Sequence, residues 1–349
     1  MPSMEAEGPH FLLRAAAPRD HRQLLALARE LDSINLPTES SKLRELLERS
    51  TRSFHGRIRD RARAVYIFCA EEIATRRVVA ASLIIGKHGT PGAPHYYLEL
   101  DADERYSHTL RKLFRHSFLR LRYAMDGPTE IGGLIVTQAM RGHPERLGKL
   151  ISWVRFLYIG LHLARFQPQV VAEMLAPMLP DHGNVFWDNY GRRVTGLSFS
   201  EADRLSTQDK EFIRALFPET PLYTFMLAEE VRNSLGAVGE NTRGAVHLLE
   251  QAGMRFLNQI DPFDGGPYYG APTADLEPVQ NRRTLIAVAG IPDPERQKSF
   301  LVGCEKADGF RAVRAEAELQ DGGHLLVTPA VLRTLRLESR ARVEIVGLP

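Results

Sequence analysis

The pattern of apolar and polar positions predicts alternating strands and helices in the first third of the chain. Leucines recur at helical spacing after Pro18, and short apolar runs bounded by polar turns are typical of strands. We expect strands over 11–15, 65–70 and 78–85, and helices over 18–31 and 42–51. The last two strands are joined by a short polar turn, which indicates a hairpin. Residues 1–10 show no such pattern and are predicted to be disordered.

The middle of the chain continues the alternation. A buried strand is predicted over 131–136, followed by a long helix over 144–166 and another strand over 170–174. The charged stretch 101–128 is interpreted as a helix and a loop, and FDGGPYYGAP, from Phe263, as a glycine-rich loop. Shorter helices are expected over 185–190, where Gly191 ends the helix, and over 209–216, 229–235 and 242–252.

This order of elements predicts an α/β fold, in which helices cover a mixed sheet. From Thr284 onward the pattern changes to short alternating runs at 285–289, 325–327 and 343–346. Alternation of this kind is typical of strands with one buried face. We therefore expect a small β-rich C-terminal domain after the α/β region.

Composition and charge exclude several classes of protein. The 349 residues are 44% hydrophobic and 25% charged, as in an ordinary globular protein, and the net charge of +2 is too balanced for nucleic-acid or membrane binding. Cys69 and Cys304 form no CxxC pair, so neither a disulfide framework nor a metal centre is expected. The N-terminus lacks a signal-peptide pattern and the apolar runs are too short to span a bilayer, which predicts a cytoplasmic protein.

The junction RGHPERLGK, from Arg141, lies where the strand over 131–136 gives way to the long helix. A helix N-terminus presents unpaired N–H groups, and Pro144 is suited to the first helical position. Gly148 leaves the backbone accessible, while Arg146 and Lys149 add positive charge. The pattern predicts a pyrophosphate site. The alternative is ordinary turn chemistry with solvated cations, because neither a Walker loop nor a GxGxxG fingerprint is present.

Several segments of the chain match those of one known family. They are RAAAPRDHRQLLALA from Arg14, LPTESSKLRELLERSTRSFHG from Leu36, VVAEML from Val170, FWDNYGRR from Phe186, FSEADRLS from Phe199, FPETPLYTFML from Phe217, LLEQAGMRF from Leu248 and IDPFDGGP from Ile260. With these segments the chain resembles the arginine N-succinyltransferases, whose fold is of the GNAT acyltransferase type. The match covers about residues 11–270, and the spacing of FDGGP from VVAEM is its most specific part.

The resemblance implies that a succinyl group passes from succinyl-CoA to the α-amino group of L-arginine, as the first step in degrading arginine to glutamate. Succinyl-CoA is then a co-substrate, and no permanently bound cofactor is expected. The resemblance places the acyl-CoA part at about 129–195 within an acyltransferase region over 11–278, in which 196–278 are a family-specific extension. The C-terminal domain is then 279–349.

By the same resemblance, Leu134 contacts the acyl-CoA, and the pyrophosphate binds at Arg141, Arg146, Leu147, Gly148 and Lys149. The chain departs from the family pattern at two positions. Arg146 occupies the first glycine position of the usual RxxGxG turn, and Gly239 stands where better-known members have a histidine assigned as proton donor. Because this histidine is absent, a substrate other than those of the better-known members is an alternative.

Acyl transfer needs a group that removes a proton from the attacking amine. Glu130, just before the strand over 131–136, is the candidate base, and its alternative is a surface carboxylate. Tyr190 is the candidate donor of a proton to the thiolate, but a packing aromatic is the commoner role. His247 is better interpreted as a histidine on a helix surface than as a replacement for the missing one.

Recognition of the substrates' charged groups needs partners of opposite charge. Asp261 and Asp264 are candidates for the guanidinium of arginine, although aspartate beside glycine is also ordinary turn composition. Arg192 is a candidate for the succinyl carboxylate, or else a solvated charge at a helix end. Asn35 lies in a loop that covers the acceptor site in GNAT-type folds, or that simply connects two helices.

Two other functions stay open. One is a GNAT-type N-acyltransferase with another acyl donor or another amine acceptor. The second is a non-catalytic subunit that binds acyl-CoA or arginine. The expected partners are the two small molecules, without nucleic acid or membrane, and the sequence leaves a homo-oligomer open.

Overall fold

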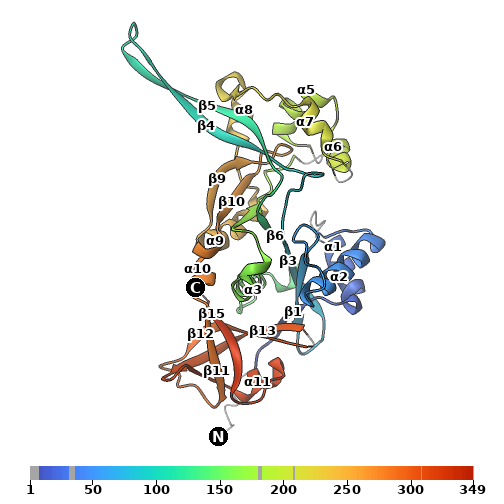
Figure 1. Cartoon of the computed structure of the whole chain (residues 1–349), viewed down its shortest axis with the longest axis vertical. Coiled ribbons are helices and arrows are strands. Elements are labelled where there is room, and N and C mark those ends of the chain that lie inside the picture. Colours follow the sequence, from blue (N-terminus) through green and yellow to red (C-terminus); the bar gives the residue numbers. More distant parts are fainter. Residues whose placement is uncertain (1–7, 31–35, 180–182, 207–208, 308, 349) are drawn as a thin grey trace. The chain divides into compact units, whose positions relative to one another are not determined.

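The computed structural model describes residues 8–30, 36–179, 183–206, 209–307 and 309–348, and the chain divides into two compact units (Figure 1). The first unit is Met1–Gly86, Ile131–Pro168 and Pro272–Pro349. The second is Lys87–Glu130 and Gln169–Ala271. Each unit has apolar clusters of its own, so both have an independent core. In the described ranges, no helix has the length and apolar character needed to cross a membrane.

The N-terminal part of the first unit confirms the predicted strands and helices. Its elements are β1 (Phe11–Ala15), α1 (His21–Glu30), α2 (Ser40–Phe54), β2 (Val65–Glu72) and β3 (Val78–Ile85). β2 pairs antiparallel with both β1 and β3, and α1 and α2 lie side by side against these strands (Figure 1). Leu24, Leu27, Leu43 and Leu47 bury the apolar faces of the two helices, as their spacing predicts.

Strand β6 (Thr129–Val136) and helix α3 (Leu147–Leu161) continue the first unit, except that Thr129 and Glu130 belong to the second. The predicted start of the helix at Pro144 is wrong. Arg146 has left-handed backbone angles, φ 51° and ψ 56°, and a right-handed helix cannot continue through such a residue. Pro144 therefore lies in a turn before the helix, and α3 begins at Leu147.

The C-terminal part of the first unit is the expected β-rich region, and its five strands close into a small barrel. The order β12-β15-β11-β14-β13 is closed by pairing of β12 with β13. β13 also pairs with β1, so the barrel is hydrogen-bonded to the N-terminal strands. The elements are α10 (Glu277–Gln280), β11 (Arg283–Ala289), β12 (Lys298–Lys306), β13 (Gly309–Gln320), β14 (His324–Val327), α11 (Pro329–Leu335) and β15 (Ala341–Gly347).

The second unit contains a sheet in the order β7-β10-β9-β4-β5-β8, with the first residues of β6 beside β7. Its strands are β4 (His95–Ser107), β5 (Lys112–Ala124), β7 (Gln169–Glu173), β8 (Leu222–Tyr223), β9 (Arg255–Ile260) and β10 (Pro267–Pro272). Its helices are α4 (Val185–Asn189), α5 (Gly191–Thr195), α6 (Phe199–Ser206), α7 (Glu211–Leu216), α8 (Glu229–Ser234) and α9 (Arg243–Gln251).

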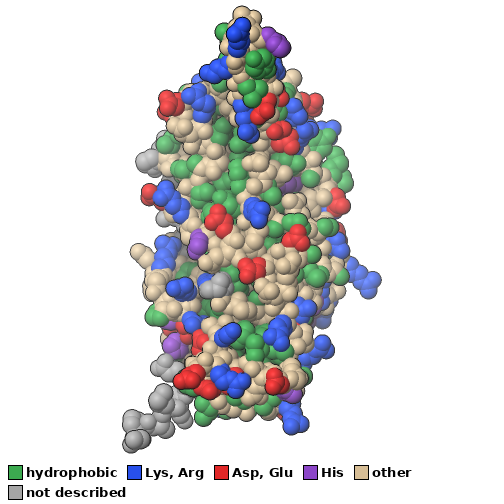
Figure 2. Space-filling view, turned by 90° about the vertical axis from the view of Figure 1, so that its left-hand side faces the viewer, with side chains coloured by type: hydrophobic (Ala, Val, Ile, Leu, Met, Phe, Trp, Pro, Cys, Tyr) green, Lys and Arg blue, Asp and Glu red, His purple; other side chains and the backbone are tan. Residues whose placement is uncertain are grey.

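The prediction of a helix and a loop over 101–128 is wrong, because β4 and β5 form one long antiparallel hairpin there. The outer part of the hairpin is exposed on both faces. Its strands therefore carry charged residues at positions where a strand with one buried face would have apolar residues. Tyr106, Leu110 and Leu113 are exposed near its end, and Figure 2 shows apolar and basic side chains together at the projecting end of the hairpin. An exposed ribbon thus lacks the periodicity that identifies a strand.

Two smaller predictions in the second unit are also wrong. Gly191 begins α5 and does not end the helical region, while Pro267–Pro272 of the predicted loop form β10. Gly270 suits this strand because a Cβ at that position would lie 2.9 Å from the carbonyl oxygen of Val170. Glycine therefore permits a close approach of two backbones within the sheet. In the sequence alone, the same glycine indicates a loop.

Candidate functional site

Four carboxylates gather in the second unit, and we call Glu130, Glu173, Asp261 and Asp264 the carboxylate cluster. Glu130 is 7% exposed, and its Oε2 lies 2.6 Å from Nδ1 of His88. Burial raises the pKa of Glu130, but the charge and hydrogen bond of His88, together with the charges of His95 and Lys210, outweigh this effect and lower the pKa. Glu130 is therefore an ionised, buried carboxylate held against an imidazole, and not the surface carboxylate of the alternative.

Glu173, at the end of β7, belongs to the same cluster and was missed in the sequence. Tyr268 donates a hydrogen bond to Glu173 Oε2 at 3.1 Å and lies 3.2 Å from Asp261 Oδ2. Burial raises the pKa of Glu173 well above its usual range, and the charges of Asp261, Glu130 and Asp264 raise it further. No ion pair joins Glu173 to a Lys or Arg of the described segments.

The two aspartates of the FDGG segment hold backbone amides. Asp264 Oδ1 accepts from the N–H of Gly266 at 2.7 Å and Oδ2 from Ala176 at 3.0 Å. Asp261 Oδ1 accepts from Phe263 at 2.7 Å, while Oδ2 faces Tyr268. Asp264 therefore fixes the loop, and Asp261 keeps one oxygen directed toward Tyr268 and the cluster.

His95, at the start of β4, is a further polar residue of this region that the sequence analysis missed. Its ring centroid lies 4.5 Å from that of His88 and 5.0 Å from that of Tyr268. Burial lowers its pKa to about 3, and Nε2 has no hydrogen-bond partner among the described residues. A signal was present, because two histidines flank the turn-rich stretch before the hairpin, but nothing local connects them with Glu130.

The N-terminus of α3 places the predicted pyrophosphate residues at one point of the first unit. Leu147 and Lys149 are buried, whereas Arg141 and Arg146 are exposed. Lys149 is 8% exposed, and its Nζ lies 5.9 Å from the ring centroid of Trp153 without a carboxylate partner in the described ranges. Burial and the charge of Arg146 lower its pKa. The turn thus presents three cations and first-turn amides, while its one carboxylate, Glu145, faces His10.

Gly148, the glycine that remains in this turn, leaves room for a ligand. A Cβ built there meets only Val136, at 3.9 Å. On β6, the half-buried Leu134 directly follows Gly133, which has a φ of +56°. A left-handed residue inside a strand marks an irregularity of the kind that re-aims a backbone or side chain.

Three other predicted residues receive less support. Tyr190 packs its ring 5.3 Å from Phe186 and 5.4 Å from Phe217, and burial raises its pKa to about 12. Arg192 is exposed and faces Asp188 at 3.6 Å, as a solvated pair on one helix face. These contacts fit the packing and helix-end alternatives. Asn35 lies outside the described residues.

The structure explains the glycine at position 239. A Cβ there would lie 3.2 Å from the carbonyl oxygen of Ala176 and 3.3 Å from that of Leu175, which is tighter than ordinary contact. The Gly239 N–H donates to the Leu175 carbonyl at 2.9 Å, so the two backbones are held close together. His247 is exposed on α9, 3.0 Å from Gln251, which confirms a histidine on a helix surface.

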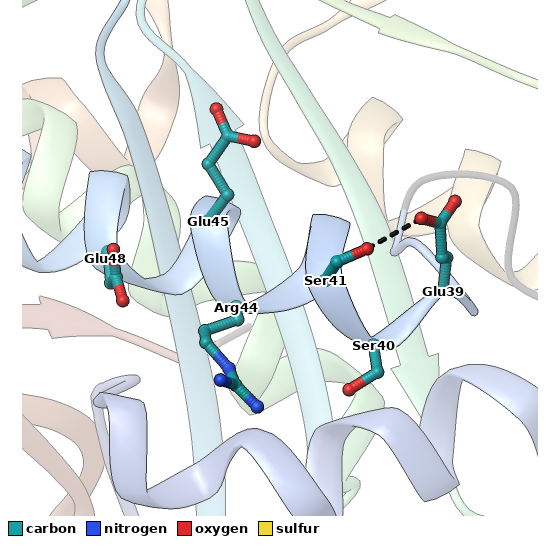
Figure 3. Close-up of a pocket in the computed structure, with 6 residues that line it drawn as sticks. All are labelled: Glu39, Ser40, Ser41, Arg44, Glu45 and Glu48. Carbon is teal, nitrogen blue, oxygen red and sulfur yellow. Dashed lines mark hydrogen bonds between the residues drawn. The ribbon is translucent and has the colours of Figure 1, made fainter.

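One surface pocket of the first unit contains none of the predicted residues (Figure 3). Its lining comes from α2 and the residue before it, namely Glu39, Ser40, Ser41, Arg44, Glu45 and Glu48. Ser41 Oγ donates to Glu39 Oε1 at 2.6 Å, while Arg44 and Glu45 point to opposite sides. This is the arrangement of a solvated helix face. In the part of the chain that the structure describes, no group of His, Cys, Asp or Glu is arranged to hold a metal ion.

Comparison with known proteins identifies related chains over nearly the whole length. The family model described as arginine N-succinyltransferase beta subunit matches residues 11–278. A second model, for the C-terminal domain of the same subunit, matches residues 282–347. The likeness therefore extends beyond residue 270, where the resemblance in the sequence was expected to stop.

Two curated relatives and one solved structure agree with the family models. The arginine N-succinyltransferase of Citrobacter koseri is 30% identical over 342 residues, which are 97% of this chain and 98% of the relative. The beta subunit of the Pseudomonas aeruginosa enzyme is 29% identical over 341 residues, with the same coverage. The structure of arginine/ornithine succinyltransferase subunit AI from Pseudomonas aeruginosa superposes with a TM-score of 0.82 at 23% identity, and covers 98% of this chain and 100% of that one. This likeness confirms the fold.

Proposed function

The chain belongs to the arginine N-succinyltransferase beta subunit family, and from this premise we propose that it transfers a succinyl group from succinyl-CoA to the α-amino group of L-arginine. The family match over nearly the whole chain is the observation on which the proposal rests. The amine nitrogen forms a bond to the thioester carbon, the carbon–sulfur bond breaks, and coenzyme A leaves as its thiol. The reaction is an N-acyl transfer without a covalent enzyme intermediate.

We assign the acceptor amine to the carboxylate cluster. Glu173 and Asp261, which share Tyr268 and lack a basic ion-pair partner in the described ranges, suit a guanidinium that offers several N–H donors. Glu130, an ionised carboxylate held 2.6 Å from Nδ1 of His88, accepts the proton that the amine loses. Asp264 acts as a positioning residue for the loop that contains Asp261.

We assign the acyl donor to β6 and the N-terminus of α3. The amides of Leu147 and Gly148 and the amine of Lys149 suit a pyrophosphate, since they combine N–H donors with an unneutralised cation. The exposed Arg141 and Arg146 add long-range positive charge. Leu134 is proposed to contact the acyl-CoA, and no permanently bound cofactor is required.

The acceptor keeps one specific alternative. The related Pseudomonas aeruginosa structure is named for both arginine and ornithine. Ornithine offers an ammonium group where arginine offers a guanidinium, and both groups suit carboxylates. The departure at Gly239 from other family members also keeps a different donor open. A buried, ionised base supports catalysis over a purely binding role.

The proposal is tested by following thiol release from succinyl-CoA or acetyl-CoA with arginine or ornithine as acceptor. We expect fast release only with succinyl-CoA and arginine. Glu130→Gln should lower kcat by about 10²- to 10⁴-fold, the usual range for a lost general base. Glu99→Gln, which removes an exposed ion pair with Arg122 on the same unit, is the matched control and should leave kcat unchanged. Equal activity of the wild type and Glu130→Gln would overturn the assignment of the base.

A further inference from the structure

Arg155, in the middle of α3, is a buried cation to which the reaction described so far gives no role. Its side chain is 3% exposed. Nε donates to the carbonyl oxygen of Ser152 at 3.2 Å, Nη2 to Ser152 Oγ at 2.7 Å, and Nη1 to the carbonyl oxygen of Gly132 at 3.4 Å. All three acceptors are neutral. No carboxylate of the described residues contacts this guanidinium.

Arg14 shows how the same unit neutralises a guanidinium when the role is structural. Arg14 is 5% exposed, and its two terminal nitrogens donate to the two oxygens of Asp20 at 2.7 and 2.8 Å. Its Nε donates to Glu71 at 2.8 Å. A buried charge without such a partner is strongly unfavourable. Burial accordingly lowers the pKa of Arg155 to about 9.

The hydrogen bonds of Arg155 leave two of its donors for one more partner. A guanidinium has five N–H donors in one plane. Three are used, and one on each terminal nitrogen is left, which is the pair that a carboxylate binds in bidentate form. Gly132, which accepts from Nη1, precedes Gly133 and lies two residues before Leu134 on β6. The free donors therefore lie beside the strand assigned to the acyl donor.

We infer that Arg155 forms a subsite for the free carboxylate of a dicarboxylic acyl group, and that it selects succinyl-CoA over uncharged acyl donors of equal length. This inference rests on the proposed function, because it uses the assignment of the donor to β6. It replaces Arg192 as the partner of the succinyl carboxylate, since Arg192 is exposed and belongs to the other unit. An uncharged acyl group would leave the buried guanidinium unpaired, which is a strong basis for rejection.

The test compares succinyl-CoA with butyryl-CoA, which has the same chain length but no carboxylate. Calorimetry without the acceptor measures donor binding, and thiol release with arginine measures kcat/KM. We expect the wild type to prefer succinyl-CoA by about 10²- to 10⁴-fold in kcat/KM. Arg155→Met should abolish this preference while butyryl-CoA is used as well as before. Arg155→Lys keeps a cation and should restore part of the preference.

Arg165→Met is the matched control, because Arg165 is half-buried near the other end of α3 and donates hydrogen bonds to neutral groups, among them Tyr158 Oη and the Phe54 carbonyl. This variant should discriminate between the donors like the wild type. The inference is overturned if Arg155→Met loses both donors equally or keeps the preference. A wild type that binds both donors alike overturns it without any variant.

Different results would contradict the proposed function and the proposed role of Arg155. If the wild type binds succinyl-CoA more tightly than butyryl-CoA but does not acylate arginine, the proposed acceptor is wrong and the inference stands. If the wild type succinylates arginine but Arg155→Met does so with unchanged donor preference, the proposed function stands and Arg155 has a structural role. Circular dichroism of each variant confirms that it is folded before either conclusion is drawn.

Discussion

The Arg14 region and the Arg155 region of the first unit each bury one guanidinium, but they treat its charge differently. Arg14 meets the carboxylates of Asp20 and Glu71, and these interactions raise its pKa despite the opposing effect of burial. Among the described residues, Arg155 donates its hydrogen bonds to carbonyl and hydroxyl oxygens, and its guanidinium lies 5.9 Å from the ring centroid of Phe156, so no carboxylate balances its charge. The difference indicates that one region is complete as folded, whereas the other has a charge that a ligand can neutralise.

Buried carboxylates show the same contrast between balanced and unbalanced charges, when those of the first unit are compared with those of the second. Asp20 and Glu71 of the first unit are buried beside the guanidinium of Arg14, and Arg76 also pairs with Glu71, so the two negative charges are balanced there. Glu173 and Asp261 lie beside a tyrosine and other carboxylates, and burial raises the pKa of both. A group whose charge is unfavourable in the free protein becomes favourable when a cationic substrate arrives. Unbalanced charges therefore mark the proposed donor residues of the first unit and, separately, the proposed acceptor residues of the second.

The largest effect is expected from removing the balanced arginine. Arg14→Met leaves the buried Asp20 without a cation and Glu71 with only the exposed Arg76, and it should lower the free energy of unfolding by about 3–5 kcal/mol. Arg155→Met removes an unbalanced charge and should change the free energy of unfolding by less than about 1 kcal/mol, because methionine fills most of the volume. Urea unfolding of both variants measures the contrast.

A compensated variant controls this experiment. Adding Asp20→Asn and Glu71→Gln to Arg14→Met removes the orphaned charges and should recover part of the lost stability. Equal destabilisation by Arg14→Met and Arg155→Met would show that the two regions do not differ as we describe.

The next effect sharpens the comparison in the second unit. Glu173→Gln removes a carboxylate proposed to bind the guanidinium, and it should raise the KM for arginine by about 10- to 100-fold, as for a lost hydrogen bond between charged groups. The free protein should become no less stable, since the amide needs no counter-charge. Steady-state kinetics and thermal unfolding measure both quantities. Glu250→Gln, on the exposed face of α9, is the control, and a KM that matches this control would remove Glu173 from the site.

The pH dependence of stability gives a smaller effect with a defined sign. Burial and the charge of Asp261 raise the pKa of Asp264 to about 7, from an ordinary value near 4. Between these values the folded protein keeps a proton that the unfolded chain has lost, so stability falls as pH rises from about 4 to about 7, by at most about 1.4 kcal/mol per pH unit.

Asp264→Asn removes this titration, and the slope of unfolding free energy against pH should become less negative in the variant. Urea unfolding at pH 5, 6 and 7 provides the comparison. An unchanged slope would show that Asp264 is ionised in the folded protein throughout this range. Glu211→Gln, at the exposed start of α7, serves as the control for loss of one acid in this unit.

The smallest effect concerns the cation at the start of α3. Lys149→Met removes one charge from the proposed pyrophosphate site, and we expect the Kd for succinyl-CoA to rise by about tenfold, which is about 1.4 kcal/mol. High salt should reduce the difference between the variant and the wild type. Lys42→Met removes an exposed lysine that pairs with Glu39 and should leave the Kd unchanged. A similar Kd for both variants would assign the phosphate site to other groups.

The sequence by itself was sufficient to locate an element wherever buried positions recur at regular spacing along the segment. Periodicity located β1, β2, β3, α1 and α2, because their buried faces recur at the strand or helix spacing. It also located the cations of the turn before α3, which are neighbours in the sequence. It failed for β4 and β5, whose outer residues have no buried face, and for the first turn of α3, where Arg146 adopts left-handed angles.

Only the tertiary structure brought together the groups that define the proposed site. His88, Glu130, Glu173 and the residues around Asp261 come from four distant segments, and no local pattern connects them. Arg155 stands in an apolar helix where the sequence shows burial but not the absence of a carboxylate. Hydrophobic spacing reports which residues are buried against the rest of the protein, whereas the balance of a buried charge depends on contacts between segments that folding alone brings into contact.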